Sequence, residues 1–144
     1  MIVLDPGHGG NDTGALSNDE QTEEKDITLS TAIKVKKALE DAGVTVYLTH
    51  TTDELVQLGD ICDYSEEKRQ MSLSVYTQTL RNMANEATGI TTYYYYGQEE
   101  TLAQTIADSF TESASGFKRN LHWELSSSSR KSSTFYFNRD GLYE

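Results

Sequence analysis

The sequence predicts an α/β protein in which a mostly parallel, twisted sheet of about five to six strands is flanked by helices. The prediction rests on an apolar run at residues 2–4, an amphipathic segment at 27–39 and a β-branched run at 44–49. Such runs are typical of a buried strand, a helix with one buried face and a second strand. In this order they form a βαβ unit, which joins two parallel strands by a right-handed crossover.

The first strand is expected to end at a turn that carries a histidine. Asp5, Pro6 and Gly7 stop the apolar run, and His8 follows within the sequence Gly-His-Gly-Gly. The glycines can adopt positive φ angles and let a ligand approach the backbone. Open parallel sheets bind ligands beyond the carboxyl ends of their strands. His8 is therefore expected to lie at a binding site.

The helix expected after this loop brings a carboxylate to the same edge. Glu24 comes just before the amphipathic segment, and Gly43 marks its end. Its apolar positions recur at near-helical spacing and are expected to form the buried face: Ile27, Leu29, Ala32, Ile33, Val35 and Leu39. A neutral imidazole and a carboxylate suit zinc, which usually takes one more protein ligand and a water. His8 and Glu24 thus predict a zinc site.

The rest of the chain supplies further strands and helices. The expected elements are a helix, or a helix and a loop, at 53–70, strands at 73–77 and 90–96, a second amphipathic helix at 99–113, and strands at 121–125 and 134–137, separated by a serine-rich turn at 126–133. No proline-rich or Gly/Ser linker divides the sequence. Residues 1–144 are therefore predicted to form one domain.

Composition limits the class of partner. With 23 acidic and 12 basic residues among 144, the chain has a net charge of −11, and its mean hydropathy is −0.60. Such a charge repels phosphate backbones and anionic lipid, which argues against nucleic-acid and membrane-surface partners. No run is long enough to span a bilayer, and the polar residues from Asp5 onward leave no room for a signal peptide. The single cysteine, Cys62, cannot form an internal disulfide.

Several stretches together resemble one enzyme family. They are Leu4-Asp5-Pro6-Gly7-His8-Gly9-Gly10, Asn11-Asp12-Thr13-Gly14-Ala15, Glu24-Lys25-Asp26 and Val46-Tyr47-Leu48-Thr49. In this part the sequence is similar to the zinc-dependent N-acetylmuramoyl-L-alanine amidases of the amidase type 3 class. The resemblance implies an amidase-like (phosphorylase/hydrolase-like) fold, one zinc ion, and hydrolysis of the amide between the lactyl group of muramic acid and the stem peptide of peptidoglycan. It also implies a domain of an exported bacterial protein, extracellular or associated with the cell wall, whose export signal is missing from this chain.

The resemblance implies roles for individual residues. His8 and Glu24 match the family's zinc ligands, and Asn11 and Gln78 are expected to bind substrate. The family's third ligand is the histidine of a Ser-Ile-His-like motif, and here Tyr76 stands at that position within the sequence Ser-Val-Tyr. A phenol is a poor zinc ligand at neutral pH, because its unperturbed pKa is about 10.

The family's catalytic glutamate also has no direct counterpart. It belongs near the end of a late strand, and the matching stretch Thr134–Phe137 contains no carboxylate. Glu124, on the preceding expected strand, is the acid that would have to act as the base in an active enzyme.

Two functions from different classes remain. In the first, the chain is a working zinc amidase. In the second, it keeps the amidase fold without catalysis and binds peptidoglycan or a protein partner. A weaker third idea, anion binding by the glycine-rich loop, is disfavoured by the net negative charge. Of the other histidines, His50 is expected at the surface, and His122 is expected to be packed or exposed and not a ligand.

Overall fold

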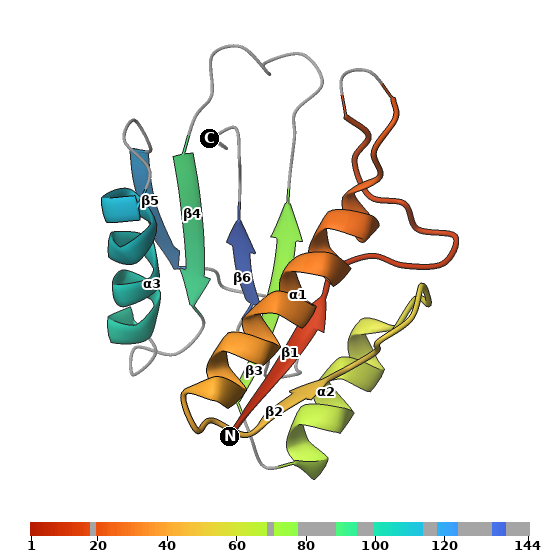
Figure 1. Cartoon of the computed structure of the whole chain (residues 1–144), viewed down its shortest axis with the longest axis horizontal. Helices are drawn as coiled ribbons and strands as arrows, with labels where there is room; N and C mark the ends of the chain where they lie inside the picture. Colours follow the sequence, from red (N-terminus) through yellow and green to blue (C-terminus); the bar gives the residue numbers. More distant parts are fainter. Residues whose placement is uncertain are drawn as a thin grey trace.

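The computed structural model describes residues 1–17, 20–68, 71–77, 89–94, 100–113, 118–123 and 134–137. Its elements in chain order are β1 (Ile2–Pro6), α1 (Glu24–Asp41), β2 (Val46–Leu48), α2 (Leu58–Glu67), β3 (Met71–Thr77), β4 (Gly89–Tyr94), α3 (Glu100–Ser113), β5 (Lys118–Trp123) and β6 (Thr134–Phe137). This mixture of strands and helices confirms the predicted α/β class (Figure 1).

β1 lies inside a four-stranded sheet of order β2-β1-β3-β6, in which every neighbouring pair is parallel. Ile2 pairs with Val46 on one side and with Met71 on the other. Val3 and Leu4 are both 0% exposed, as expected for an apolar strand inside a parallel sheet. Because β1 has neighbours on both sides, the loop at its carboxyl end starts from the interior of the sheet and not from its rim.

The helices pack on different strands. α1 contacts β1, β2 and β3, and it lies alongside β1 in Figure 1. α2 contacts β3, while α3 packs on β4 and β5, which form a second, two-stranded parallel sheet. β4 also contacts β6, so the smaller sheet lies beside the larger one (Figure 1).

The buried face of α1 differs from the predicted one. Ile27 and Ile33 are 41% and 46% exposed, whereas the buried positions are Glu24, Thr28 and Ala32. These three residues recur every fourth position and therefore share one stripe of the helix. Two of the three are polar, and their side chains meet backbone groups of the segment after β1: Glu24 accepts from Ala15, and Thr28 donates to Gly7.

Several further predictions can be compared with the structure. The βαβ unit is confirmed, since α1 connects β1 to the parallel strand β2, and the helix expected within 53–70 is α2. A single sheet of about five to six strands stays a prediction, because the described strands form sheets of four and two. The ends of the strands expected at 90–96 and 121–125, and the turn at 126–133, lie outside the described residues. None of the described helices is both long and apolar enough to cross a bilayer.

Candidate metal centre

The loop that carries His8 turns sharply at the carboxyl end of β1. The φ angle is 66° at His8, 138° at Gly9 and 55° at Gly10. Side chains other than glycine rarely tolerate such angles, so the surroundings must hold His8 in this conformation. Backbone hydrogen bonds of 2.9 and 3.0 Å between Gly9 and Asp12 close the turn. A Cβ atom on Gly9 would overlap the carbonyl oxygen of Glu54, which explains why glycine is needed there.

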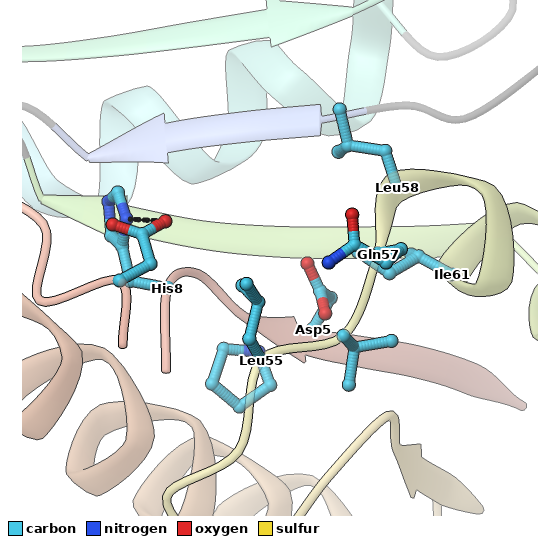
Figure 2. A pocket seen from close by; sticks show the side chains of 9 residues that line it. Asp5, His8, Leu55, Gln57, Leu58 and Ile61 are labelled. Atoms are coloured by element: carbon cyan, nitrogen blue, oxygen red, sulfur yellow. Dashed lines mark hydrogen bonds and ion pairs between the residues drawn. The ribbon is translucent and has the colours of Figure 1, made fainter. Parts of the chain in front are cut away.

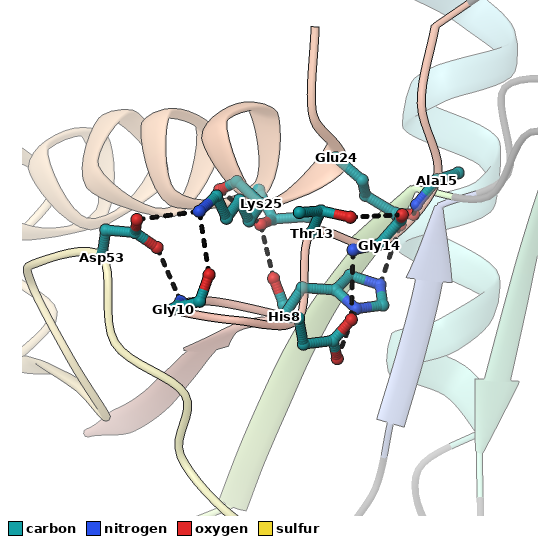
Figure 3. A network of polar contacts seen from close by, with 11 residues as sticks. His8, Gly10, Thr13, Gly14, Ala15, Glu24, Lys25 and Asp53 are labelled. Carbon is teal, nitrogen blue, oxygen red and sulfur yellow. Dashed lines mark hydrogen bonds and ion pairs between the residues drawn. The ribbon is translucent and has the colours of Figure 1, made fainter. Parts of the chain in front are cut away.

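His8 and Glu24 converge from different elements (Figure 3). Glu24 is the first residue of α1, and His8 Nε2 lies 3.4 Å from its Oε1. The Glu24 side chain is only 4% exposed and that of His8 21%. The N–H of Ala15 donates to Glu24 Oε2 at 2.8 Å, but among the described residues nothing donates a hydrogen bond to Oε1. A buried carboxylate oxygen in this state is stabilised by a proton or a cation.

The spacing of this pair fits zinc. Zinc binds imidazole nitrogen and carboxylate oxygen at about 2.0–2.2 Å, and tetrahedral geometry then places two such ligand atoms roughly 3.3–3.4 Å apart. The separation of 3.4 Å between His8 Nε2 and Glu24 Oε1 matches this value. In the part of the chain that the structure describes, no third His, Cys, Asp or Glu completes a metal-binding group. The pair therefore fits two of the protein ligands of a zinc site.

Asp12 orients the imidazole. Its Oδ2 lies 3.0 Å from His8 Nδ1, and because a carboxylate only accepts, the ring proton is assigned to Nδ1. Nε2 is then left with a lone pair on the side of Glu24. The hydrogen bond from His8 is the main reason why the pKa of Asp12 lies below its ordinary value of 3.8. A carboxylate on the second nitrogen of a metal-binding histidine is a common arrangement.

Gly14 allows His8 and Glu24 to approach each other. Its φ is +64°, and a Cβ atom there would lie 2.7 Å from both Glu24 Cβ and His8 Cδ2. Its N–H also donates to Asp12 Oδ1 at 3.1 Å. The sequence motif contains Asp12 and Gly14 but did not indicate what either residue does. The available signal was an Asp-x-Gly spacing in the loop between His8 and the helix.

A cavity of about 270 Å³ lies beside His8 and Asp12 (Figure 2). Its apolar walls come from the end of β1, the segment before α2 and the first turns of α2: Pro6, Leu55, Val56, Leu58 and Ile61. Leu55 and Leu58 are 45% and 73% exposed, so the cavity has an apolar rim. A cavity of this size beside His8 can accommodate one portion of a larger ligand.

The strand register places Tyr76, the position expected to supply the third ligand. Pro6, the last residue of β1, pairs with Val75 on β3. Tyr76 therefore lies one residue beyond the β1 ladder, at the sheet edge from which the His8 loop starts. It pairs with Tyr136 on β6. The backbone thus brings Tyr76 to the expected edge, and its role as a ligand stays a prediction.

The other predicted site residues are less informative. Asn11 is exposed in the loop that follows His8. Gln78 and Glu124 lie outside the described residues. Their assignments to substrate binding and to the base stay predictions. His122 is a β5 residue that pairs with Tyr93 on β4.

The expectation that His50 lies at the surface is wrong. His50 is 6% exposed, and its Nδ1 lies 3.2 Å from the hydroxyl of Thr49. That hydroxyl donates to Oδ1 of the buried Asp5 at 2.7 Å. The parallel pairing of β2 with β1 brings these polar groups together, and the contacts draw the residue after β2 inward.

Fold and site together define the class of protein. A parallel sheet whose interior strand ends in a loop that brings an imidazole close to a buried carboxylate places its candidate site where open α/β proteins bind their ligands. The sequence matches the N-acetylmuramoyl-L-alanine amidase family over residues 2–136. The chain belongs to that family, as the motifs around His8 and Glu24 predicted.

Similar proteins agree with this assignment. The probable cell wall amidase LytH of Staphylococcus aureus is 41% identical over 106 residues, which cover 73% of this chain and 34% of that protein. The chain thus spans about a third of the length of the curated relatives that it matches. The amidase AmiC2 of Nostoc punctiforme superposes with a TM-score of 0.81 at 27% identity, covering 96% of this chain and 77% of AmiC2.

Two clostridial structures are also similar. An N-acetylmuramoyl-L-alanine amidase from Clostridium difficile 630 gives a TM-score of 0.81 at 26% identity, over 94% of this chain and 76% of that one. CwlD of Clostridioides difficile, solved in complex with the GerS lipoprotein, gives 0.79 at 21% identity, over 96% of this chain and 80% of CwlD. The similarity to CwlD shows only that the fold is shared.

Proposed function

We propose that the chain is a single zinc-dependent amidase domain, which hydrolyses the amide between N-acetylmuramic acid and L-alanine in peptidoglycan. The observation that supports this most is the approach of His8 Nε2 to Glu24 Oε1 at 3.4 Å, with the carboxylate buried and Oε1 without a hydrogen bond from the described residues. Family membership supports the same reaction. Because the relatives are named as cell wall amidases, we infer an extracellular or cell-wall location.

Each residue of the site has a proposed task. His8 and Glu24 hold zinc, which when bound supplies Lewis-acid activation of water and of an amide carbonyl. Asp12 keeps the proton on His8 Nδ1 so that Nε2 can act as a ligand. The cavity beside His8 receives the part of the substrate next to the scissile amide. The third ligand is assigned to position 76, the base to Glu124, and further substrate contacts to Asn11 and Gln78.

The experiment combines metal analysis with a hydrolysis assay on the purified chain. We expect one zinc ion per chain and release of stem peptides from peptidoglycan, both lost after treatment with a chelator. Glu24→Gln should abolish zinc uptake, because an amide is a neutral and weaker ligand. Glu40→Gln is the matched control, since this carboxylate on the same helix is 46% exposed and is paired with Lys36 Nζ at 2.6 Å, away from the site. A folded wild-type chain that neither binds zinc nor releases peptide would refute the proposal.

A second function is favoured by Tyr76. A phenol in place of the family's histidine weakens zinc binding, and the chain would then be an amidase-fold module that binds peptidoglycan or a protein partner without hydrolysis. The CwlD structure, which was solved with a lipoprotein, is an example of an amidase in a protein complex. Cosedimentation with peptidoglycan, without release of peptide in the presence of excess zinc, would support this function over catalysis. Tyr76→His should then increase zinc affinity.

A further inference from the structure

One ion pair links three separate segments around the His8 loop (Figure 3). Lys25, on the first turn of α1, places its Nζ 2.8 Å from Asp53 Oδ2 and donates to the carbonyl of Gly10 at 3.0 Å. Asp53, between β2 and α2, accepts a hydrogen bond from the N–H of Gly10 through Oδ1 at 2.7 Å. Both backbone polar groups of Gly10 are therefore held by this pair.

The link acts on backbone that needs external support. His8 has a φ of 66°, an angle that a residue with a side chain rarely adopts, so contacts with its surroundings must hold it. On the other side of His8, the carbonyl of Gly7 accepts a hydrogen bond of 2.6 Å from the hydroxyl of Thr28. His8 thus lies between two anchors, one at Gly7 and the other at Gly10.

Close packing adds to these hydrogen bonds. A Cβ atom on Gly9 would overlap Glu54, and one on Gly10 would lie 3.3 Å from the nitrogen of Leu55. The segment that carries Asp53 is therefore packed directly against the backbone that follows His8. The same segment forms part of the cavity wall through Leu55 and continues into α2.

We propose that the Lys25–Asp53 pair is a positioning device: it holds the His8 imidazole against Glu24 in the conformation that binds zinc, without contacting the metal itself. This inference rests on the proposed function. Asp53 Oδ1 accepts from Gly10 and Oδ2 accepts from Lys25 Nζ, so the charge of this carboxylate is already paired with an ammonium group. The Lys25 side chain is 13% exposed and that of Asp53 is 53% exposed, so the inference depends on the backbone hydrogen bonds of the pair and not on burial of its charges.

The charges of the two groups support the arrangement. The hydrogen bond from Lys25 lowers the pKa of Asp53 below its ordinary value of 3.8, and the hydrogen bond to Asp53 raises the pKa of Lys25 above 10.5. Both groups are therefore charged throughout the neutral range, where the proposed enzyme works.

The test compares Asp53→Ala with Asp41→Ala. Asp41 is a matched control because its Oδ2 lies 2.7 Å from Lys37 Nζ in an exposed ion pair on α1, and its loss removes the same charge. We expect Asp53→Ala to weaken zinc binding by about tenfold or more, as for other groups that support metal ligands. Asp41→Ala should change it less than about twofold. The dissociation constants are measured by competition with a coloured chelator.

A second readout needs no metal. In metal-free protein labelled with ¹⁵N, Asp53→Ala should shift or broaden the resonances of the His8 ring nitrogens, whereas Asp41→Ala should leave them unchanged. A purely structural role would lower the melting temperature without moving these resonances. If Asp53→Ala does not fold, Lys25→Met is measured in its place, because it leaves the bond from Gly10 to Asp53 available.

The outcomes separate this inference from the proposed function. Unchanged His8 resonances, together with a zinc affinity equal to that of Asp41→Ala, would overturn the positioning role. If the wild-type chain binds no zinc, the proposed function fails, and the resonances of the metal-free variants still decide whether the pair positions His8.

Discussion

At the scale of single residues, the candidate site depends on unusual backbone angles. His8 has a φ of 66°, although it carries a side chain. This conformation costs a residue other than glycine about 1–2 kcal/mol. The neighbouring contacts offset that cost, and in return the imidazole points toward Glu24 and not into solvent. A strained residue beside a buried carboxylate is typical of a functional site.

Gly14→Ala tests how closely His8 and Glu24 must approach. The new Cβ would lie 2.7 Å from atoms of both side chains, so the pair must separate. We expect zinc affinity to fall more than about tenfold. The free energy of unfolding should decrease by about 1–2 kcal/mol from the backbone angle and by roughly 1–3 kcal/mol more from overpacking. Chelator competition and urea denaturation measure the two effects.

Gly43→Ala is the control for this variant. Gly43 also has a positive φ, 86°, but a Cβ atom there meets nothing within 4 Å. It should show the cost of the backbone angle alone, with zinc affinity unchanged. Equal effects of the two alanine substitutions on zinc affinity would show that Gly14 has no special part in the site.

The sequence predicted the residues whose chemistry is visible in a motif, and it did not indicate those defined by contacts. His8 and Glu24 follow from a glycine-rich turn and from a carboxylate at the start of a helix. The position at the start of the helix would suit Glu23 as well, because the helix dipole favours an acid at either place, and only the family resemblance selected Glu24. The link from Lys25 to Asp53 was not found either, since 28 positions separate the two residues.

At the scale of elements, α1 both covers the sheet and anchors the loop. Its buried stripe consists of Glu24, Thr28 and Ala32, of which two are polar. The periodicity of apolar residues correctly predicted a helix, but it assigned Ile27 and Ile33 to the buried face. That assignment is wrong because hydrophobic periodicity carries no information about the backbone groups that the helix must bind.

Thr28→Val tests the anchoring role of α1. The substitution preserves the shape of the side chain but removes the hydroxyl that donates to Gly7 at 2.6 Å. A buried carbonyl that loses its partner costs about 1–3 kcal/mol, so the free energy of unfolding should fall by that amount. Chemical denaturation measures the change.

Thr105→Val on α3 is the matched control. Thr105 is exposed, and its hydroxyl donates at 2.8 Å to the carbonyl of Thr101 in the same helix. Its replacement should alter stability by less than about 0.5 kcal/mol. If both valine variants lose equal stability, the contact with Gly7 has no special weight.

At the scale of the whole molecule, acidic charge dominates. The chain has 23 acidic and 12 basic residues, so repulsive pairs of charges outnumber attractive ones. The exposed pairs Lys36–Glu40 and Lys37–Asp41 add only small stabilisation, which salt also weakens. Screening should therefore relieve more repulsion than the attraction it removes.

Raising sodium chloride from about 10 to 300 mM, where the Debye length falls from roughly 30 to 6 Å, should increase the melting temperature. An increase of about 2–4 °C corresponds to roughly 1 kcal/mol for a domain of this size. Differential scanning fluorimetry measures the shift, with potassium chloride as a check that ionic strength is the cause. A lower melting temperature in salt would mean that the local ion pairs outweigh the net charge.

The sheet order has a consequence for how the chain reaches its native state. β1 pairs with β2 and β3, and every pairing in the four-stranded sheet is parallel, so no tight hairpin can start its assembly. During synthesis β1 leaves the ribosome before both of its neighbours, and β3 begins only at Met71. One side of β1 stays uncovered until the chain has been made as far as β3, which exposes an aggregation-prone segment to other nascent chains.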